Sequence, residues 1–124
     1  MRTTIDLNAD VGEVEGESNV DAALMHWISS CNIACGAHAG DPQRMRDTVR
    51  LALHNNVAIG AHPGYADRES MGRREQAWTP EGLRALIHDQ LVRLDTLCRE
   101  EGARMVHVKP HGALYNQAAR DPAM

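Results

Sequence analysis

Four short apolar segments alternate along the chain with longer segments whose apolar residues recur at helical spacing, and this alternation constrains the fold more than any other feature. The short segments predict strands over residues 3–7, 31–35, 57–61 and 105–109. The longer ones predict helices over residues 19–30 and 42–55, a long helix from Pro80 to a stop at Gly102, and a helix or turn from about Gly112. Because each helix carries the chain back across the sheet, successive strands run parallel. The sequence therefore predicts an α/β fold with a parallel sheet.

The predicted helices begin at recognisable signals. A capping side chain followed by proline, which suits the first helical position, occurs three times: Asp41-Pro42, Thr79-Pro80 and Asp121-Pro122. The last of these predicts a further helix from Asp121. For the first helix, Ser18 is the expected cap and Asp21 its capping-box partner. Its expected core-facing stripe is Val20, Ala23, Leu24, Trp27 and Ile28.

Polar residues recur after every strand, whereas a doubly wound sheet places them at the one point where its strand order reverses. The glycine-rich Gly-x-Gly-x-x-Gly motif of dinucleotide-binding sheets is also absent before the first helix. Both observations favour a distorted, TIM-type β/α barrel over a doubly wound sheet. Four strands cannot close a barrel, so residues 1–124 are interpreted as a single unit, the N-terminal half of a barrel domain. The absent C-terminal half, or a second copy of the chain, is expected to cover the open edge.

Charge, hydropathy and cysteine usage narrow the function classes. The net charge is −4 and no basic patch occurs, which argues against a nucleic-acid partner. The chain lacks an apolar run long enough for a signal peptide or a membrane span. Three cysteines without CxxC spacing argue against a disulfide framework. We therefore expect a cytoplasmic protein whose cysteines are small buried hydrophobic residues.

Polar side chains share one face of each predicted strand, because alternate residues of a strand point to the same side. That face is expected to point into the barrel, whereas the apolar residues of each strand, including Val106, Val108 and Cys35, are expected to pack under helices. Its polar members are Asp6, Asn8, Asp10, Asn32, His62, His107, Lys109 and His111. We expect a functional cluster at the upper rim, which His38 joins from the loop after the second strand. The candidate catalytic residues are Asp10, His38, His62, Lys109 and His111.

Two further interpretations concern ligands. Asp10, His38, His62 and His111 would also serve as a shell for a divalent metal such as zinc or manganese. The loop over residues 63–74 carries Arg68 and Arg73, whose guanidinium groups suit a carboxylate or phosphate, although a solvated, salt-bridged loop is an equal interpretation. His107 is as well explained by a core role as by a functional one.

Common catalytic motifs are absent. The chain has no Gly-x-x-x-x-Gly-Lys-[Ser/Thr] phosphate loop, so it shows no recognisable ATP site. It also lacks the Gly-x-Ser-x-Gly elbow and the His-Glu-x-x-His helix motif.

Four ordered segments resemble the LamB/YcsF family, the A subunits of 5-oxoprolinase. They read DLNADVGE (6–13), NIACGAHAGD (32–41), VAIGAHP (57–63) with DRE (67–69), and HVKPHGALYN (107–116). The chain departs from the family pattern at Ala37, where phenylalanine is usual, and at Met71, where an aromatic residue is usual. Family members are longer than this chain, so we expect half of the rim to be missing and the chain alone to be inactive.

The resemblance implies a distorted β/α barrel similar to that of metal-dependent polysaccharide deacetylases. It also implies ATP-dependent opening of 5-oxo-L-proline to L-glutamate, with ATP as cosubstrate and with the 5-oxoprolinase subunits B and C as partners. On this interpretation, Asp10 and one of the rim histidines form an acid/base pair, and Lys109 stabilises the developing oxyanion. The candidate substrate-binding residues are Asn8, Asn32, Arg68, Arg73, Tyr115 and Asn116.

Two alternatives stay open at this point. The first is a metal-dependent amide hydrolase or deacetylase-like enzyme, for which a divalent metal is the expected cofactor. The second is a non-catalytic subunit that binds 5-oxoproline and presents it to subunits B and C. The sequence leaves a homo-oligomer open as well.

Overall fold

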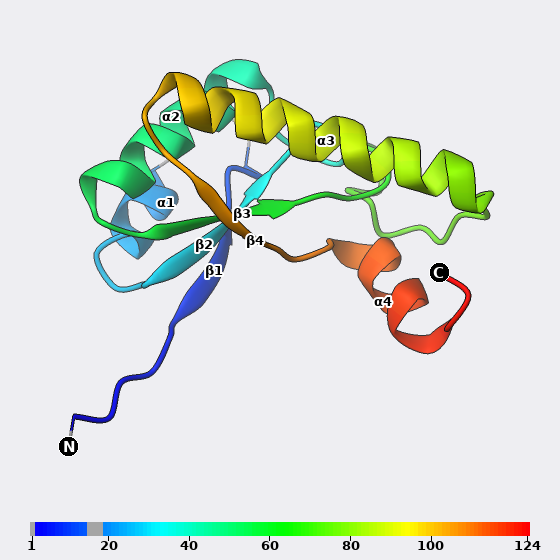
Figure 1. Ribbon diagram of the computed structural model, residues 1–124, viewed down its shortest axis with the longest axis horizontal. Coiled ribbons are helices and arrows are strands. Elements are labelled where there is room, and N and C mark those ends of the chain that lie inside the picture. Colours follow the sequence, from blue (N-terminus) through cyan, green and yellow to red (C-terminus); the bar gives the residue numbers. More distant parts are fainter. Residues whose placement is uncertain (1, 15–18) are drawn as a thin grey trace.

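The computed structural model describes residues 2–14 and 19–124, and it contains a four-stranded parallel sheet in the order β1-β2-β3-β4 (Figure 1). This confirms the predicted α/β fold. The elements are β1 (Asn8–Val11), α1 (Asn19–Leu24), β2 (Ser30–Ala34), α2 (Pro42–His54), β3 (Ala58–His62), α3 (Pro80–Glu100), β4 (Met105–Val108) and α4 (Gly112–Arg120). No described helix is long and apolar enough to cross a membrane.

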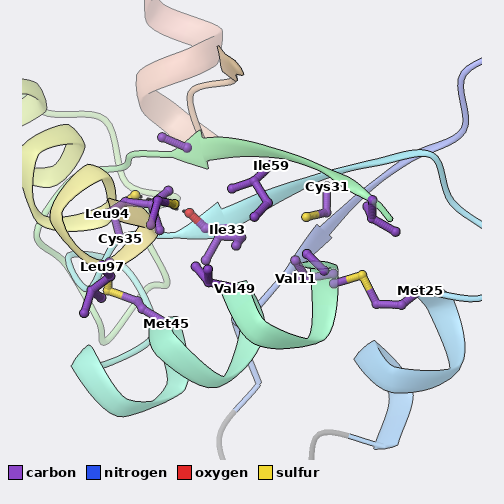
Figure 2. Close-up of a cluster of buried hydrophobic side chains, with 14 residues drawn as sticks. Val11, Met25, Cys31, Ile33, Cys35, Met45, Val49, Ile59, Leu94 and Leu97 are labelled. Atoms are coloured by element: carbon purple, nitrogen blue, oxygen red, sulfur yellow. Dashed lines mark hydrogen bonds between the residues drawn. The ribbon is translucent and has the colours of Figure 1, made fainter. Parts of the chain in front are cut away.

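One face of the sheet packs against α2 and α3 and forms the main core (Figures 1 and 2). Ile33 and Ile59 from the strands meet Val49 of α2 and Leu94 of α3, and all four side chains are buried. Apolar surface removed from water in this way is the main stabilising contribution to a fold of this size.

The cysteines lie in this core, as expected. All three are free and buried. Burial raises the pKa of the Cys31 thiol to about 12 and that of the Cys35 thiol to about 11. A buried thiol that stays protonated is a poor nucleophile, so Cys35 is a packing residue.

Two of the three predicted helix starts are confirmed. The Asp41 side chain accepts a hydrogen bond from the backbone N–H of Arg44 at 2.9 Å, and Thr79 accepts one from Gly82 at 3.1 Å. The third stays a prediction, because only three residues follow Asp121 in this chain and they form a turn after α4. The Asp121 carboxylate accepts from the backbone N–H of Ala123, as a capping side chain does.

The first strand lies later than predicted. It covers Asn8–Val11, which pairs with Ser30–Ile33 of β2, rather than residues 3–7. Ile5 and Leu7 are 81% and 51% exposed, and the chain before β1 runs away from the sheet (Figure 1). Apolar alternation placed the strand too early, because a strand also needs a neighbour within hydrogen-bonding reach. The predicted phase of Asn8 and Asp10 is unaffected.

The first helix is shorter than predicted, and its expected stripe is wrong at Val20, Ala23 and Trp27, although Ile28 does pack against the core. The chain leaves the helix after Leu24 and re-enters the sheet at Ser30, and the intended core residues Val20 and Trp27 are 67% and 79% exposed. Met25 is buried instead. The expected cap Ser18 lies outside the described residues. The Asp21 carboxylate accepts a hydrogen bond from the Gly12 backbone N–H at 2.8 Å and so ties α1 to the turn after β1.

The prediction for Val106 and Val108 was also wrong, since they are 54% and 46% exposed. The register is irregular here: Ile59 pairs with Met105 and Gly60 with His107, which leaves Val106 as an extra residue. Such a bulge resets the alternation of side chains along the strand. Met105 therefore packs against the core, and His107 can still reach Asn32 on the polar face.

The second face of the sheet is polar, as predicted. Asn32 is fully buried there and hydrogen-bonds to Asn8, while the Nε2 atom of His107 lies 2.7 Å from the side-chain Oδ1 atom of Asn32. The His107 ring lies against Gly60. Any other residue at position 60 would clash with it, because an added Cβ would be 2.0 Å from His107 Nε2. This polar network leads to the strand ends, where the ionisable groups gather.

Candidate functional site

The carboxyl ends of the strands and the loops that follow them carry the candidate site. Asp10 belongs to β1, His62 ends β3, Lys109 follows β4, and His111 is the residue before α4. His38 lies in the loop between β2 and α2. The structure therefore brings together all five residues that the sequence predicted for the rim, and it adds Glu13 to them.

Glu13 is the centre of the cluster. Its Oε1 atom lies 2.9 Å from His38 Nε2, 3.3 Å from His62 Nε2 and 3.3 Å from His111 Nδ1. The two ring nitrogens of His62 and His111 that face it are themselves 3.0 Å apart. The three histidines are buried, and the Glu13 side chain is 16% exposed. One carboxylate oxygen thus meets a nitrogen from each of three imidazole rings.

Backbone carbonyls fix the orientation of two of these rings. The His62 Nδ1 atom lies 2.6 Å from the carbonyl oxygen of Lys109, and the His111 Nε2 atom lies 2.6 Å from that of Met71. Because a carbonyl only accepts, these two nitrogens carry hydrogens. In the neutral rings, the opposite nitrogens are then bare acceptors, and those are the atoms that face Glu13.

His38 is held by packing. Its ring stacks on that of His111 with centroids 3.7 Å apart and planes 8° apart, and His38 Nδ1 has no hydrogen-bond partner among the described residues. Gly64 and Gly72 line this ring: an added Cβ at Gly64 would lie 2.6 Å from His38 Nδ1. The glycines are therefore required by the close approach of the loop to the imidazoles.

Asp10 forms a second polar group beside the cluster. Its Oδ1 atom accepts hydrogen bonds from Lys109 Nζ at 2.9 Å and from Asn32 Nδ2 at 2.8 Å, and its Oδ2 lies 3.4 Å from His62 Nε2. Partial burial would raise the pKa of Asp10, but the hydrogen bonds from Lys109 and Asn32 outweigh it and hold the pKa below 3.8. Asp10 is therefore an ionised carboxylate at neutral pH, paired with an ammonium group.

Local electrostatics also set the charge of the cluster. Burial alone would raise the pKa of Glu13, yet its contacts with His38 and His62 hold it well below its ordinary value of 4.5. Burial is the largest influence on His111 and lowers the pKa of its imidazole, while the Met71 carbonyl acts in the opposite direction. An ionised Glu13 and a neutral His111 are the states that this environment favours.

A hollow of about 220 Å³ opens next to these groups. Its lining comprises Asp10, His62, Lys109, Pro110, His111, Gly112, Tyr115 and Asn116. Two of the predicted substrate-binding residues, Tyr115 and Asn116, thus line the hollow. Asn8 and Asn32 lie on the polar face of the sheet, where Asn32 contacts Asp10 directly.

The two arginines expected at the site lie elsewhere. Arg68 donates to the carbonyl oxygen of Gly40 at 2.8 Å and so braces the loop after β2, and Arg73 is exposed. Neither residue lines the hollow. Their predicted role in substrate binding stays a prediction.

The sequence analysis did not predict Glu13 at the site, because Glu13 lies beyond the end of β1, where the alternation of side chains along a strand no longer applies. Gly12 has a φ of 73°, a left-handed conformation that glycine adopts readily, and it turns the chain between Asp10 and Glu13. Alternation therefore says nothing about the direction of the Glu13 side chain. The sequence signal that could have identified Glu13 was its position as the last residue of the family-like segment over residues 6–13.

Three imidazoles and one carboxylate are a donor set that suits a divalent transition metal. One candidate ligand atom from each of Glu13, His38, His62 and His111 lies within 4.8 Å of all the others. The residues present therefore fit a metal in the type and the spacing of their donor atoms.

The parallel strands and the site at their carboxyl ends define a protein of the TIM-like barrel class. A solved structure supports that class: the lactam utilization protein from Thermus thermophilus is 44% identical and matches with a TM-score of 0.90 over 96% of this chain and 49% of that chain.

The chain belongs to the LamB/YcsF family, which matches residues 5–124. It is similar to the A subunit of 5-oxoprolinase from Erwinia tasmaniensis, with 56% identity over 97% of this chain and 48% of that protein. It is also similar to the corresponding A subunit from Methylococcus capsulatus, with 52% identity over 100% of this chain and 48% of that protein. The chain thus spans about half the length of the curated relatives it matches.

Proposed function

We propose that the protein acts as the A subunit of an ATP-dependent 5-oxoprolinase, opening 5-oxo-L-proline to L-glutamate together with subunits B and C in the cytoplasm. The observation that carries this proposal is the buried cluster of Glu13 with three histidines beside the Asp10–Lys109 pair, at the edge of a small hollow. Its relatives are named as A subunits of 5-oxoprolinase and as a lactam utilization protein, and these names support the same substrate class.

The chemistry of a lactam explains why such a site suits the reaction. An unstrained cyclic amide is a poor electrophile, so phosphorylation of its oxygen by ATP makes the ring carbon open to attack. A first water molecule loses a proton and bonds to the ring carbon, and the ring nitrogen takes a proton as the C–N bond breaks, which leaves glutamyl phosphate. A second water molecule hydrolyses this acyl phosphate to L-glutamate and phosphate, and the ADP formed in the first step is the other product. The chain has no phosphate-loop sequence, which is compatible with an ATP site on a partner subunit.

The arrangement of the residues suggests their roles. The Asp10 carboxylate lines the hollow and lies 3.4 Å from His62 Nε2, so Asp10 is the proposed acid/base group and His62 is the residue proposed to hold it in position. The Lys109 ammonium group lines the same hollow and is the proposed donor to the developing oxyanion. Tyr115 and Asn116, from the first turns of α4, are the proposed contacts that position the ring.

The test is ATP-dependent release of glutamate from 5-oxo-L-proline by a full-length A subunit that contains this chain, mixed with subunits B and C, whereas residues 1–124 alone should be inactive. We expect turnover by the full-length complex, and we expect Asp10→Asn to reduce it by about 10²–10⁴-fold, the usual contribution of a positioned acid or base, and His62→Ala to reduce it as well. The exposed His88 serves as a matched control, so His88→Ala should turn over normally.

Other outcomes of the same assay separate the alternatives. Glutamate release without ATP or partner subunits would replace the proposal with a metal-dependent amide hydrolase, which the three-histidine cluster also suits. The second alternative predicts a different pair of results: both variants bind 5-oxoproline normally by calorimetry, and their complexes turn over normally. These results would show a subunit that only presents the substrate.

A further inference from the structure

We infer that Glu13, His38, His62 and His111 bind one divalent transition-metal ion, of which zinc matches the donor set best, and that Asp10 stays outside its ligand shell. The inference rests on the arrangement of acceptors at the rim and needs no assumption about the reaction. Three features support it: the direction of the bare nitrogens, the spacing of the ligand atoms, and the backbone groups that hold the rings.

The first feature is a convergence of acceptors. Lys109 and Met71 carbonyls take the N–H groups of His62 and His111, so in the neutral rings the lone pairs of the two opposite nitrogens point at each other across 3.0 Å. The Glu13 oxygen lies 3.3 Å from each of them. Three acceptors at this separation, two of them on buried rings, repel one another unless a cation lies between them.

The second feature is the spacing. A proton bridges only two atoms, whereas Glu13 Oε1 meets nitrogens of three rings at 2.9, 3.3 and 3.3 Å. Zinc bonds to nitrogen and oxygen of about 2.0–2.1 Å require tetrahedral ligand atoms to be about 3.3–3.4 Å apart. Four of the six separations, from 2.9 to 3.3 Å, are close to that value, and all six lie within 4.8 Å. An ion would enter when the His38 ring turns out of its stack on His111.

The third feature is the support around the ligands. A histidine that binds a metal generally donates its other N–H to a carboxylate or a backbone carbonyl, and both His62 and His111 do so. The carbonyl that holds His111 belongs to Met71, a non-glycine residue with a φ of 56°. That conformation is costly, and it brings the Met71 carbonyl to His111 Nε2 while the adjacent Gly72 lies against the same ring.

Asp10 is engaged elsewhere. Its Oδ1 atom receives hydrogen bonds from both Lys109 and Asn32, and its nearest approach to the cluster is the 3.4 Å contact with His62. A carboxylate that already pairs with an ammonium group has less negative charge to offer a metal. Glu13 takes the ligand position that the strand pattern assigned to Asp10.

Metal content of the protein purified without chelator, followed by removal of the metal and titration with zinc, tests the inference. We expect one ion per chain and a higher melting temperature when zinc is added back, because a ligand that binds only the folded state stabilises it. Glu13→Gln and His111→Ala should each weaken binding by more than the roughly 10–100-fold that changing an outer-shell partner causes.

Two variants serve as controls. Asp10→Asn should keep zinc affinity within the roughly 10–100-fold range of an outer-shell change, and His88→Ala, which alters an exposed histidine, should leave the affinity unchanged. The absence of stoichiometric metal after zinc, manganese, cobalt, nickel and iron(II) have been offered would overturn the inference, and so would wild-type affinity in Glu13→Gln.

If the variants fail to fold, X-ray absorption of the zinc-loaded wild-type protein decides the question. Three imidazole nitrogens with one carboxylate oxygen support the inference, and any other set of protein ligands overturns it. None of these measurements uses substrate, ATP or partner subunits. Zinc binding at this site without glutamate release would support this inference and contradict the proposed function. Glutamate release without zinc binding would support the proposed function and overturn this inference.

Discussion

The two faces of the sheet carry adjacent residues of the same strands but have different tasks. On the face under α2 and α3, Ile33 and Ile59 are packed among apolar side chains (Figure 2). On the other face, Asn32 and Gly60, the neighbours of those residues, support a hydrogen-bonded polar network that leads to the rim. Residues that stabilise the core and residues that support the site are thus neighbours in the chain on opposite faces of the sheet, so substitutions on the two faces should have separable effects.

The largest effect on stability is expected on the helix-covered face. Leu94→Ala removes a fully buried side chain from the core, which should lower the free energy of unfolding by about 2–5 kcal/mol. Urea denaturation measures this loss. Val92→Ala, on the same helix but 48% exposed, is the matched control and should cost less than about 1 kcal/mol. Equal losses in the two variants would show that α3 does not separate a core side from a solvent side.

A smaller loss is expected on the polar face. Asn32 is fully buried, and its amide contacts Asn8, Asp10 and His107. Asn32→Ala leaves these partners unsatisfied and should lower the free energy of unfolding by about 1–3 kcal/mol. The exposed Asn116, replaced by alanine, should change it by less than about 0.5 kcal/mol. A loss for Asn32→Ala as small as that of the control would mean that the network adds nothing to stability.

The contribution of Asp10 should depend on pH. Its folded-state pKa lies below the ordinary value of 3.8, so the stability that the ionised carboxylate adds is fully present above pH 3.8 and is lost as the pH falls through the lower folded-state pKa. Both partners of the Lys109–Asp10 pair are partly exposed, so this contribution should be at most about 1 kcal/mol. Unfolding of wild type and Asp10→Asn, compared from neutral pH to below 3.8, should show the difference shrinking with acid. A difference that does not change with pH would contradict the assignment.

The smallest effect should come from charges outside both faces. Glu101 pairs with Arg50 and Arg46, and the hydrogen bonds from these arginines lower its pKa to about 2. Because solvent and salt screen such surface pairs, Glu101→Gln should lower the melting temperature only slightly, and added salt should remove the difference. Glu69→Gln, at the exposed pair with Arg74, should have no measurable effect. A large, salt-resistant loss at Glu101 would show that the contact between α2 and α3 depends on this ion pair.

Much of the fold followed from local patterns, and the failures have a common cause. Helical spacing and the caps at Asp41 and Thr79 are local properties, and they predicted α2 and α3 well. The placement of β1 and the burial of Val106 depend on which strand lies alongside and in which register. Neither pairing nor a bulge leaves a periodic signal in the chain, so apolar alternation alone placed Ile5 and Val106 incorrectly.

The site was predictable where a strand carried the residue and unpredictable where a turn did. Asp10 and His62 were placed by strand phase, and His111 by its continuation. Glu13 lies beyond the left-handed Gly12, and Arg68 lies in a loop whose path no periodicity describes. The carbonyls that orient His62 and His111 are backbone groups, so residue identity carries no direct sign of them.

The turn at Gly12 also makes spacing as important as chemistry. Within four consecutive residues, one carboxylate is delivered to an ammonium group and the other to three imidazoles, because a single backbone conformation sends the chain in a new direction between them. Removing or adding one residue between positions 10 and 13 would exchange or misdirect both acids while leaving the composition almost unchanged. Transplanting this arrangement into another scaffold would therefore require copying the length and handedness of the turn as well as the acidic side chains.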